Sequence, residues 1–381
     1  MITRRQFVTS ICLLPYALRL ETGSAAERGP TPESSRGPSP GPSITEARYY
    51  RKASVPKNGA ECRLCPRECV VPDGELGFCR ARKNTKGTLY ALGYAAPCAI
   101  HVDPIEKKPF YHVHPRSTSF SIASAGCNLR CRFCQNWQIS QVSPLETTNH
   151  FLPPEEVVEM ALKSGSESIA YTYTEPTNFF EYMIDVAALA RKRGLLNVYH
   201  SNGYINPEPL KELTAYLDAA DIDLKGFTES FYHTLCDAKL KPVLETLKIL
   251  KEKGVWIEIT NLVIPGQNDD VATIAGMCTW IRRDLGPDVP VHFSRFFPMY
   301  KMTNISPTPV STVERAREIA MKAGLHYAYT GNIPGHAGES TYCPGCKKVV
   351  IKRVGYSIQA NEVKNGKCKF CGVPIKGIWS A

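Results

Sequence analysis

The sequence predicts an α/β protein whose core is a partial (β/α)6 TIM-like barrel. From about residue 118 onward, short runs rich in β-branched and aromatic residues alternate with longer amphipathic segments. Strands that alternate with helices form parallel sheets through right-handed crossovers. About six such units, rather than eight, indicate an incomplete barrel. Clustered cysteines on both sides of this region predict small Cys-rich N-terminal and C-terminal metal-binding modules.

The expected core elements alternate regularly along the chain. Strands are expected at residues 119–124, 168–174, 197–201, 220–225, 256–264, 290–297 and 327–330. Helices are expected at residues 154–163, 178–192, 207–217, 243–253, 271–283 and 312–322. Chemistry in barrels of this type gathers at the carboxyl ends of the strands. Motifs that directly follow a strand are therefore the first candidates for a site.

The N-terminal residues precede the expected folded part. Residues 1–26 contain Arg4 and Arg5, then a modestly apolar run that ends in small residues. This pattern resembles a twin-arginine signal, which favours export to the periplasm or cell surface over a cytoplasmic tail that carries paired arginines by chance. Residues 27–45 are rich in Pro, Gly and Ser and predict an extended linker. No run of about 18 apolar residues occurs, so no membrane span is expected.

Cysteine is the most distinctive component of the sequence, with 15 residues. Eleven of them fall in three groups, and such tight spacing in a long chain indicates metal ligands before disulfides. The four isolated cysteines are expected to act as small buried hydrophobic residues. They are Cys12, Cys98, Cys236 and Cys278.

The central group, here called the cluster loop, follows the first expected core strand. Cys127, Cys131 and Cys134 place three thiolates on one short loop with Cys-x3-Cys-x2-Cys spacing. A [4Fe-4S] cluster has four irons, so three cysteines leave one iron open for a small chelating ligand. A structural zinc site normally takes four ligands, and no fourth Cys or His follows within this loop. The loop therefore predicts an iron–sulfur cluster with an open iron.

The cluster loop, with Phe133 before its last cysteine, resembles the signature of the radical S-adenosylmethionine (SAM) superfamily. The resemblance covers about residues 60–335. Within the superfamily, the chain resembles the pyruvate formate-lyase activating enzyme-like branch. Within that branch, it most resembles the radical SAM member of the AmmeMemoRadiSam gene system. Further carriers are the sequences CRLCPR at 62–67, DPIEKKP at 103–109 and CQNW at 134–137. The resemblance implies that SAM binds the open iron and that one electron from the cluster releases a 5′-deoxyadenosyl radical.

Two motifs after the second and third core strands are SAM-binding candidates by this resemblance. Glu175 occupies the place of the superfamily's acidic motif, in which a carboxylate meets the SAM amino group. Its alternative role is that of an acid at a helix N-terminus. Ser201 and Asn202 offer hydroxyl and amide groups that suit a ribose, although Asn-Gly is also common in ordinary turns.

Two later motifs complete the expected site. Asp223 and Lys225 share one face of the fourth strand. By resemblance Asp223 contacts the ribose or a peptide and Lys225 meets a carboxylate, while an internal Asp–Lys pair is an equal alternative. The turn after the fifth strand resembles the adenine-contacting turn of the activating-enzyme-like branch. By this resemblance, Ile264 packs on the adenine.

Each flanking group supplies four thiolates, enough to close a metal site. The N-terminal cysteine set predicts structural zinc or an auxiliary iron–sulfur cluster and consists of Cys62, Cys65, Cys69 and Cys79. The C-terminal cysteine set predicts a zinc ribbon or a rubredoxin-like iron site and consists of Cys343, Cys346, Cys368 and Cys371. The resulting division of the chain is a signal at 1–26, a linker at 27–45, an N-terminal module at 46–115, a radical SAM core at 116–335 and a C-terminal module at 340–381.

The net charge of +10 does not favour a nucleic-acid partner. Most of the excess lies in residues 340–381, where lysines would offset the negative charge of a metal held by four thiolates. No interleaving of aromatic and basic residues supports binding of nucleic acid.

The function expected from the sequence is that of a radical SAM oxidoreductase supplied by a low-potential electron donor. A glycyl radical enzyme is one candidate substrate, and another protein, an RNA or a small molecule are alternatives. A non-catalytic iron–sulfur or zinc scaffold or sensor is the alternative from a different class.

Overall fold

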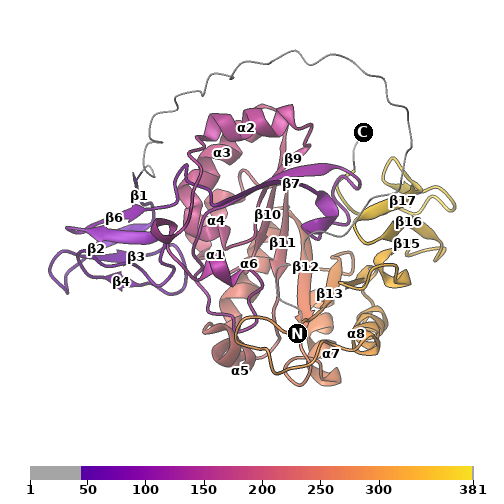
Figure 1. Ribbon diagram of the computed structural model, residues 1–381. Coiled ribbons are helices and arrows are strands. Elements are labelled where there is room, and N and C mark those ends of the chain that lie inside the picture. The colour runs from indigo at the N-terminus through magenta and orange to yellow at the C-terminus, as the bar shows by residue number, and fades with distance from the viewer. Residues whose placement is uncertain (1–43, 380–381) are drawn as a thin grey trace, which may run out of the picture. The chain divides into compact units, whose positions relative to one another are not determined.

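The computed structural model describes residues 44–379, which belong to one compact unit (Figure 1). The expected signal at 1–26, the linker up to residue 43 and Cys12 lie outside the described residues. Among the described residues, no helix has the length and hydropathy needed to cross a membrane.

An eight-stranded sheet forms the centre of this unit, in the order β14-β13-β12-β11-β10-β9-β8-β7. Strands β8 to β14 are parallel neighbours in chain order, and β7 pairs antiparallel with β8. Because β7 and β14 are both edges, the barrel is open. The expected α/β fold with a partial barrel is confirmed. The strands are β7 (Ala99–Pro104), β8 (Thr118–Ala123), β9 (Ser168–Tyr171), β10 (Leu196–Ser201), β11 (Ala219–Asp223), β12 (Trp256–Val263), β13 (Val291–Arg295) and β14 (Ala328–Gly331).

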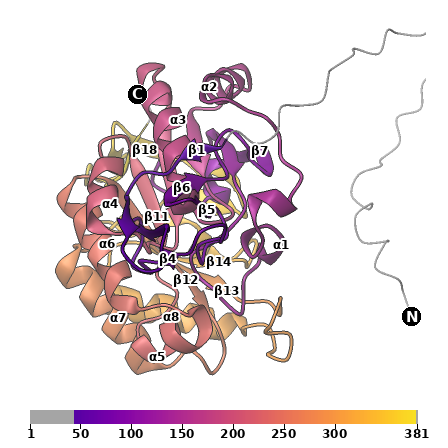
Figure 2. The same cartoon turned by 90° about the vertical axis from the view of Figure 1, so that its left-hand side faces the viewer.

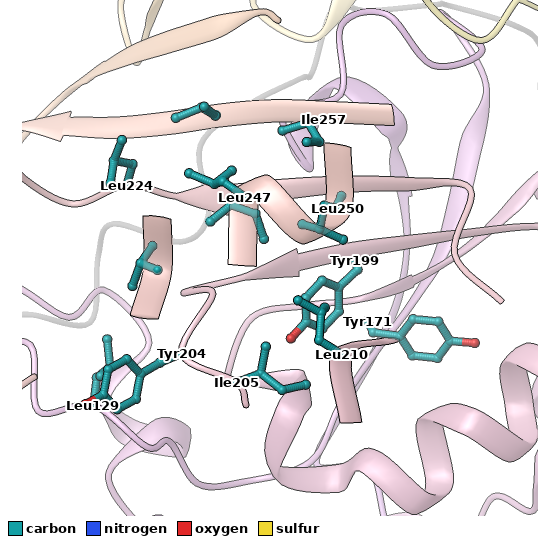
Figure 3. Close-up of a cluster of buried hydrophobic side chains, with 14 of the residues drawn as sticks. Leu129, Tyr171, Tyr199, Tyr204, Ile205, Leu210, Leu224, Leu247, Leu250 and Ile257 are labelled. Carbon is teal, nitrogen blue, oxygen red and sulfur yellow. The ribbon is translucent and has the colours of Figure 1, made fainter. Parts of the chain in front are cut away.

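Amphipathic helices connect successive parallel strands. In α6, Val243, Leu247 and Leu250 are fully buried at the spacing of one helix face. Figure 3 shows Leu247 and Leu250 beside Ile257 of β12. The longer helices are α2 (Pro154–Lys163), α3 (Phe180–Lys192), α4 (Pro207–Leu213), α6 (Leu240–Glu252), α7 (Val271–Asp284) and α8 (Val310–Lys322). Short helical turns are η1 (Ile105–Lys107), α1 (Trp137–Ser140), η2 (Pro144–Glu146), η3 (Pro176–Phe179), α5 (Glu229–Phe231), η4 (Tyr232–Cys236) and η5 (Ala337–Glu339).

Small antiparallel sheets carry the two flanking cysteine sets. The N-terminal sheets have the orders β1-β6-β5 and β2-β3-β4, and Figure 2 looks onto these strands. Their strands are β1 (Thr45–Glu46), β2 (Tyr50–Ala53), β3 (Gly59–Cys62), β4 (Val70–Val71), β5 (Arg82–Thr85) and β6 (Thr88–Ala91). The C-terminal strands are β15 (Thr341–Tyr342), β16 (Val349–Val354), β17 (Ser357–Asn361), β18 (Val363–Lys364) and β19 (Lys367–Cys368).

The C-terminal strands pack against the open edge of the barrel. Arg353 of β16 is buried and donates hydrogen bonds to the carbonyl of Tyr111 and to Thr341 Oγ1, both at 2.7 Å. Tyr111, Tyr329 and Val350 belong to one hydrophobic cluster between β14 and this sheet. These contacts fix the C-terminal strands beside the segment that precedes β8.

Candidate active site

A cavity of about 480 Å³ lies at the carboxyl ends of the parallel strands. The cluster loop after β8 contributes all three of its cysteines to the wall. The ends of β9, β10 and β11 contribute Glu175, Ser201, Asn202, Asp223 and Lys225. Five of the six predicted SAM contacts therefore face the same space as the predicted cluster ligands, as parallel strands require.

Backbone contacts hold the cluster loop. The amides of Arg130 and Arg132 donate to the carbonyls of Cys236 and Leu235 in η4, both at 2.9 Å. Gly126 has a φ of +104°, and a Cβ at this position would lie 2.6 Å from the carbonyl oxygen of Cys79. Only glycine fits this close approach of the loop to the N-terminal strands.

The thiols of this loop must lose their protons before they can bind a metal. Burial raises the pKa of Cys127 well above its usual value. A hydrogen bond with Cys236, together with burial, does the same for the pKa of Cys131. Since thiolates rather than thiols ligate metals, cluster assembly here releases protons.

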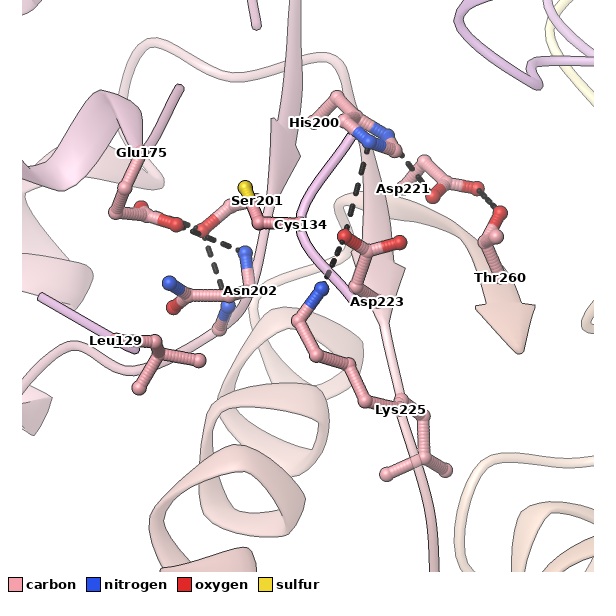
Figure 4. A network of polar contacts seen from close by, with 12 residues as sticks. Leu129, Cys134, Glu175, His200, Ser201, Asn202, Asp221, Asp223, Lys225 and Thr260 are labelled. Atoms are coloured by element: carbon pink, nitrogen blue, oxygen red, sulfur yellow. Dashed lines mark hydrogen bonds and ion pairs between the residues drawn. The ribbon is translucent and has the colours of Figure 1, made fainter. Parts of the chain in front are cut away.

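Glu175 is the centre of a buried hydrogen-bond network beside the cluster loop (Figure 4). Its Oε1 accepts from Ser201 Oγ at 2.8 Å and from the hydroxyl and amide of Thr177 at 2.6 and 3.0 Å. Its Oε2 accepts from the amide of Asn202 at 2.9 Å. Glu175 thus caps η3, as the alternative interpretation expected, and also lines the cavity. These donors hold the carboxylate in one orientation.

Asn202 connects this network to the cluster loop. Its Nδ2 donates to Asn128 Oδ1 at 2.9 Å and lies 3.7 Å from Cys127 Sγ. Asn128 is fully buried and donates in turn to the carbonyl of Tyr204. The orientation of the Glu175 carboxylate is thereby coupled to the position of the first cluster cysteine.

A charged group occupies the wall formed by β10 and β11. Lys225 Nζ bonds to Asp223 Oδ2 at 2.8 Å, so the internal pair is formed. His200 lies 3.1 Å from Asp221 and 3.9 Å from Asp223. Burial would raise the pKa of Asp223, but Lys225 and His200 lower it overall. Burial would lower the pKa of Lys225, yet Asp223 raises it well above its usual value, so both groups are charged.

Comparisons with known proteins decide the family. The model of the radical SAM superfamily matches residues 121–277. An uncharacterized protein of Methanocaldococcus jannaschii is 46% identical over 334 residues, which cover 87% of this chain and 99% of the relative. The chain belongs to the radical SAM superfamily.

Other similarities are more distant. A pyruvate formate-lyase-activating enzyme of Listeria monocytogenes is 24% identical over 160 residues, covering 40% of this chain and 64% of the relative. This supports the activating-enzyme-like branch. A crystal structure of a radical SAM methyltransferase from Sphaerobacter thermophilus aligns with a TM-score of 0.46 and 16% identity, over 59% of this chain and 71% of that one. The resemblance seen in the cluster loop is confirmed at the level of the superfamily and this branch.

The sixth predicted SAM contact lies elsewhere. Ile264 is fully buried in the hydrophobic core, and among the described residues Leu262, not Ile264, lines the radical SAM cavity. The amide of Ile264 donates to Asn268 Oδ1 at 2.7 Å, which fixes the turn after β12. A role for Ile264 beside adenine stays a prediction.

The segment at residues 103–109, for which the sequence pattern indicates no role, forms another wall of the cavity at the strand ends. Lys108 Nζ bonds to Asp103 Oδ2 at 2.5 Å and to the Tyr173 hydroxyl at 2.8 Å. Burial lowers the pKa of Lys108 to about 8, although Asp103 opposes the shift. Tyr173 has a φ of +65°, a conformation that is strained for a residue with a side chain. The backbone thus adopts a left-handed turn two residues before Glu175.

His200 and Thr260 also line the radical SAM cavity but were not predicted. Thr260 Oγ1 donates to Asp221 Oδ2 at 3.0 Å, and His200 pairs with Asp221 across β10 and β11. For His200, a polar residue one position before the carboxyl end of an expected strand was the available signal, whereas Thr260 lies in the middle of its strand. The register between strands, which brings these residues together, is absent from the sequence pattern.

The C-terminal cysteine set converges on a single point. Cys343 Sγ and Cys371 Sγ are 3.5 Å apart, and Cys346 Sγ and Cys368 Sγ are 3.7 Å apart. The four sulfur atoms all lie within 4.8 Å of one another, as the ligands of one metal ion do. The set is therefore arranged as a metal-binding cluster.

Proposed function

We propose that this protein cleaves SAM reductively at a [4Fe-4S] cluster held by Cys127, Cys131 and Cys134, and directs the resulting 5′-deoxyadenosyl radical to a substrate. The observation that carries the proposal is the shared cavity. Three thiols and the Glu175–Asn202 network face it from adjacent strand ends. A cavity of about 480 Å³ falls in the size range of small-molecule sites.

The donor set fits the proposed cofactors. Among the described residues that line the cavity, the cluster-loop cysteines are the sole cysteines, which leaves one iron of a four-iron cluster for SAM. His200, which lines the cavity, is paired with the buried Asp221 at 3.1 Å and adds a polar group to this wall.

The chain's own residues would position SAM rather than perform the bond cleavage. Glu175, fixed by its donors, is suited to accept hydrogen bonds from the SAM ammonium group. Asp223 remains ionised and is suited to a ribose hydroxyl, while Lys225 supplies a cation for a carboxylate. The walls at Tyr173 and Leu262 would exclude water from the reacting centre.

Formation of 5′-deoxyadenosine from SAM is the direct test. The full chain is reconstituted anaerobically with iron and sulfide, reduced and supplied with SAM. We expect 5′-deoxyadenosine from the wild type and a loss of at least about 100-fold in Cys131→Ala. Cys278→Ala, which changes a buried cysteine of α7, is the matched control and should retain activity. No product from the wild type, or equal rates in Cys131→Ala, would contradict the proposal.

A glycyl radical enzyme is the first substrate class to test, because relatives named as activating enzymes support it. A protein substrate that acquires a carbon radical would give an organic radical signal in electron paramagnetic resonance (EPR). The alternative substrates would instead stimulate 5′-deoxyadenosine formation without a stable protein radical.

The C-terminal cysteine set is proposed to hold zinc. A Zn–S bond of about 2.3 Å gives a tetrahedral edge of about 3.8 Å, close to the Sγ separations of 3.5 and 3.7 Å. One zinc per chain, lost in Cys346→Ser, is the expected metal analysis. One iron in its place would support the rubredoxin-like alternative.

Export through the twin-arginine route is proposed for residues 1–26 on the sequence pattern alone. Replacement of Arg4 and Arg5 by lysine should retain the protein in the cytoplasm. Unchanged fractionation of the variant would contradict this.

A further inference from the structure

The N-terminal cysteine set lies at a second, small cavity of about 20 Å³, apart from the SAM cavity. Backbone pairing brings its members together, since the amide of Cys62 donates to the carbonyl of Cys69 at 2.9 Å. All four cysteines line this cavity, together with Arg82, Asn128 and Asn178. Four thiols from the ends of β3 and the turns before β4 and β5 thus face one space.

The spacing of these thiols differs from that of the C-terminal set. Four thiolates on one metal ion share a tetrahedron with edges of about 3.8 Å, as the C-terminal sulfur atoms do. Among the described cysteines, no three of the N-terminal set lie within 4.8 Å of one another. The same is true of the cluster loop. Thiolates on a four-iron cube stand farther apart, because each binds a different iron. The N-terminal thiols therefore do not form the compact group that a single ion requires.

Two buried donors line this second cavity and lack an acceptor. Arg82 is 1% exposed and Asn178 is 2% exposed. Arg82 Nη1 and Nη2 bond to the Arg48 carbonyl and to Glu181, but its Nε has no partner within residues 44–379, and neither does Asn178 Nδ2. Buried N–H groups are nearly always paired. Sulfur atoms of a bound cluster would supply acceptors, and such hydrogen bonds tune cluster potentials.

The second cavity adjoins the cluster loop. Asn128 lines it and also accepts from Asn202, which contacts Cys127 Sγ. Arg130 donates to the Cys127 carbonyl at 2.8 Å and to the Phe78 carbonyl, one residue before Cys79. These contacts give a short bonded route between the two groups of cysteines.

We propose that Cys62, Cys65, Cys69 and Cys79 hold a second [4Fe-4S] cluster that relays single electrons to the cluster at the cluster loop. A low-potential one-electron donor, such as a reduced flavin or iron–sulfur protein, is oxidised by one electron. The second cluster gains this electron and then loses it to the first cluster, so no proton or leaving group is involved. The presence of the second cluster stands on the N-terminal residues, whereas its relay role rests on the proposed SAM chemistry.

Iron content and EPR spectra of full-length variants test the second cluster. The anaerobically reconstituted wild type should contain about eight irons. A triple variant with Cys127, Cys131 and Cys134 changed to alanine should keep about four irons, with an EPR signal of the reduced protein that does not respond to SAM. The variant Cys65→Ala with Cys79→Ala should also keep about four irons, with a signal that changes when SAM binds. Cys278→Ala is the control and should keep about eight.

The outcomes separate this inference from the proposed function. About four irons and two zinc ions in the wild type would overturn the second cluster, and so would a triple variant without iron. Both results hold even if the double variant, Cys65→Ala with Cys79→Ala, fails to fold. A wild type whose eight irons give no 5′-deoxyadenosine would overturn the proposed function alone.

Reduction kinetics test the relay. Reduced flavodoxin should reduce the first cluster at least about tenfold more slowly in the double variant, while dithionite, a small reductant, should do so at the wild-type rate. Equal rates with flavodoxin would refute the relay and leave the second cluster in place.

Discussion

At the residue scale, the carboxylate of Glu175 is held in one orientation at the wall of the cavity that the cluster loop lines. A carboxylate accepts from every neighbour it has here, namely the hydroxyls of Ser201, Thr177 and Tyr199 and the amides of Thr177 and Asn202. An amide in its place would direct its NH2 group at one of these donors. The charge and the acceptor pattern are thus both specific to a carboxylate.

Glu175→Gln is expected to weaken SAM binding by about 2 kcal/mol, or about 30-fold, because a charged hydrogen bond is lost. The measurement is a titration of the reconstituted protein with SAM, followed by the EPR signal of the reduced cluster. Glu167→Gln, at a half-exposed glutamate paired with His114, is the control and should bind SAM normally. Equal affinity in both variants would remove Glu175 from the SAM site.

Lys108 is predicted to make stability depend on pH. Its folded pKa of about 8 is below the unfolded value of 10.5, since burial disfavours its charge. Between these values the unfolded chain binds more protons, so the contribution of Lys108 to stability rises as pH rises from about 8 to 10 and is smallest below 8. The melting temperature of the wild type relative to Lys108→Met should therefore increase over this range. A constant difference would show that the pKa of Lys108 is not lowered.

At the element scale, the alternation of strands and helices could be predicted closely. The segment expected at 119–124 is β8 (Thr118–Ala123), and the helix expected at 154–163 is α2 (Pro154–Lys163). Strand β7 was missed, because its sequence AIHVDP is short and ends in proline, and its burial does not alternate along the strand. It pairs with β8 as an edge strand, where proline is tolerated. Pairing of this kind depends on tertiary contacts that no local pattern records.

The residues of the site could also be predicted in part, because the order of the strands brings the strand ends together. Glu175 and Asn202 follow strands and Asp223 ends one, so their common position results from topology alone. Ile264 also follows a strand but turns into the core, because its own turn is closed by Asn268. Local side-chain direction at a strand end is set by such turns.

The cluster loop is held against the N-terminal strands by Gly126, which gives a test at this scale. Gly126→Ala should lose most of its bound iron, because the added Cβ meets the Cys79 carbonyl at 2.6 Å and the φ of +104° is also strained. Gly165→Ala is the matched control, because its φ is +68° with no atom within 4 Å of the added Cβ. This control carries only the cost of the left-handed conformation, about 1 kcal/mol. Equal iron contents in the two variants would show that the close approach is unimportant.

At the scale of the whole molecule, the C-terminal strands complete the cavity. Gly355 and Tyr356, between β16 and β17, line it together with Glu339 of η5. The cavity therefore depends on residues separated by more than two hundred positions in the chain. A change in the docking of the C-terminal strands should alter the cavity without touching the cluster.

Arg353 provides the test of this docking. It is buried, bonds to the Tyr111 carbonyl and Thr341 Oγ1, and lies 4.2 Å from the centre of the Tyr111 ring. Arg353→Met should lower the free energy of unfolding by about 2 to 3 kcal/mol, because charged hydrogen bonds in the interior are lost. Lys352→Met, which changes the exposed neighbour of Arg353, is the control. It should lower the free energy of unfolding by less than about 0.5 kcal/mol.

Arg353→Met and Lys352→Met also distinguish an effect on the docking of the C-terminal strands from an effect on SAM cleavage. Since Arg353 touches neither the cluster loop nor Glu175, the Arg353→Met protein should bind its full iron content and its C-terminal metal. SAM cleavage measured without substrate should then persist, while turnover of a bound substrate falls, because the wall at Tyr356 is displaced. Loss of iron in Arg353→Met would show instead that the C-terminal strands stabilise the cluster loop itself.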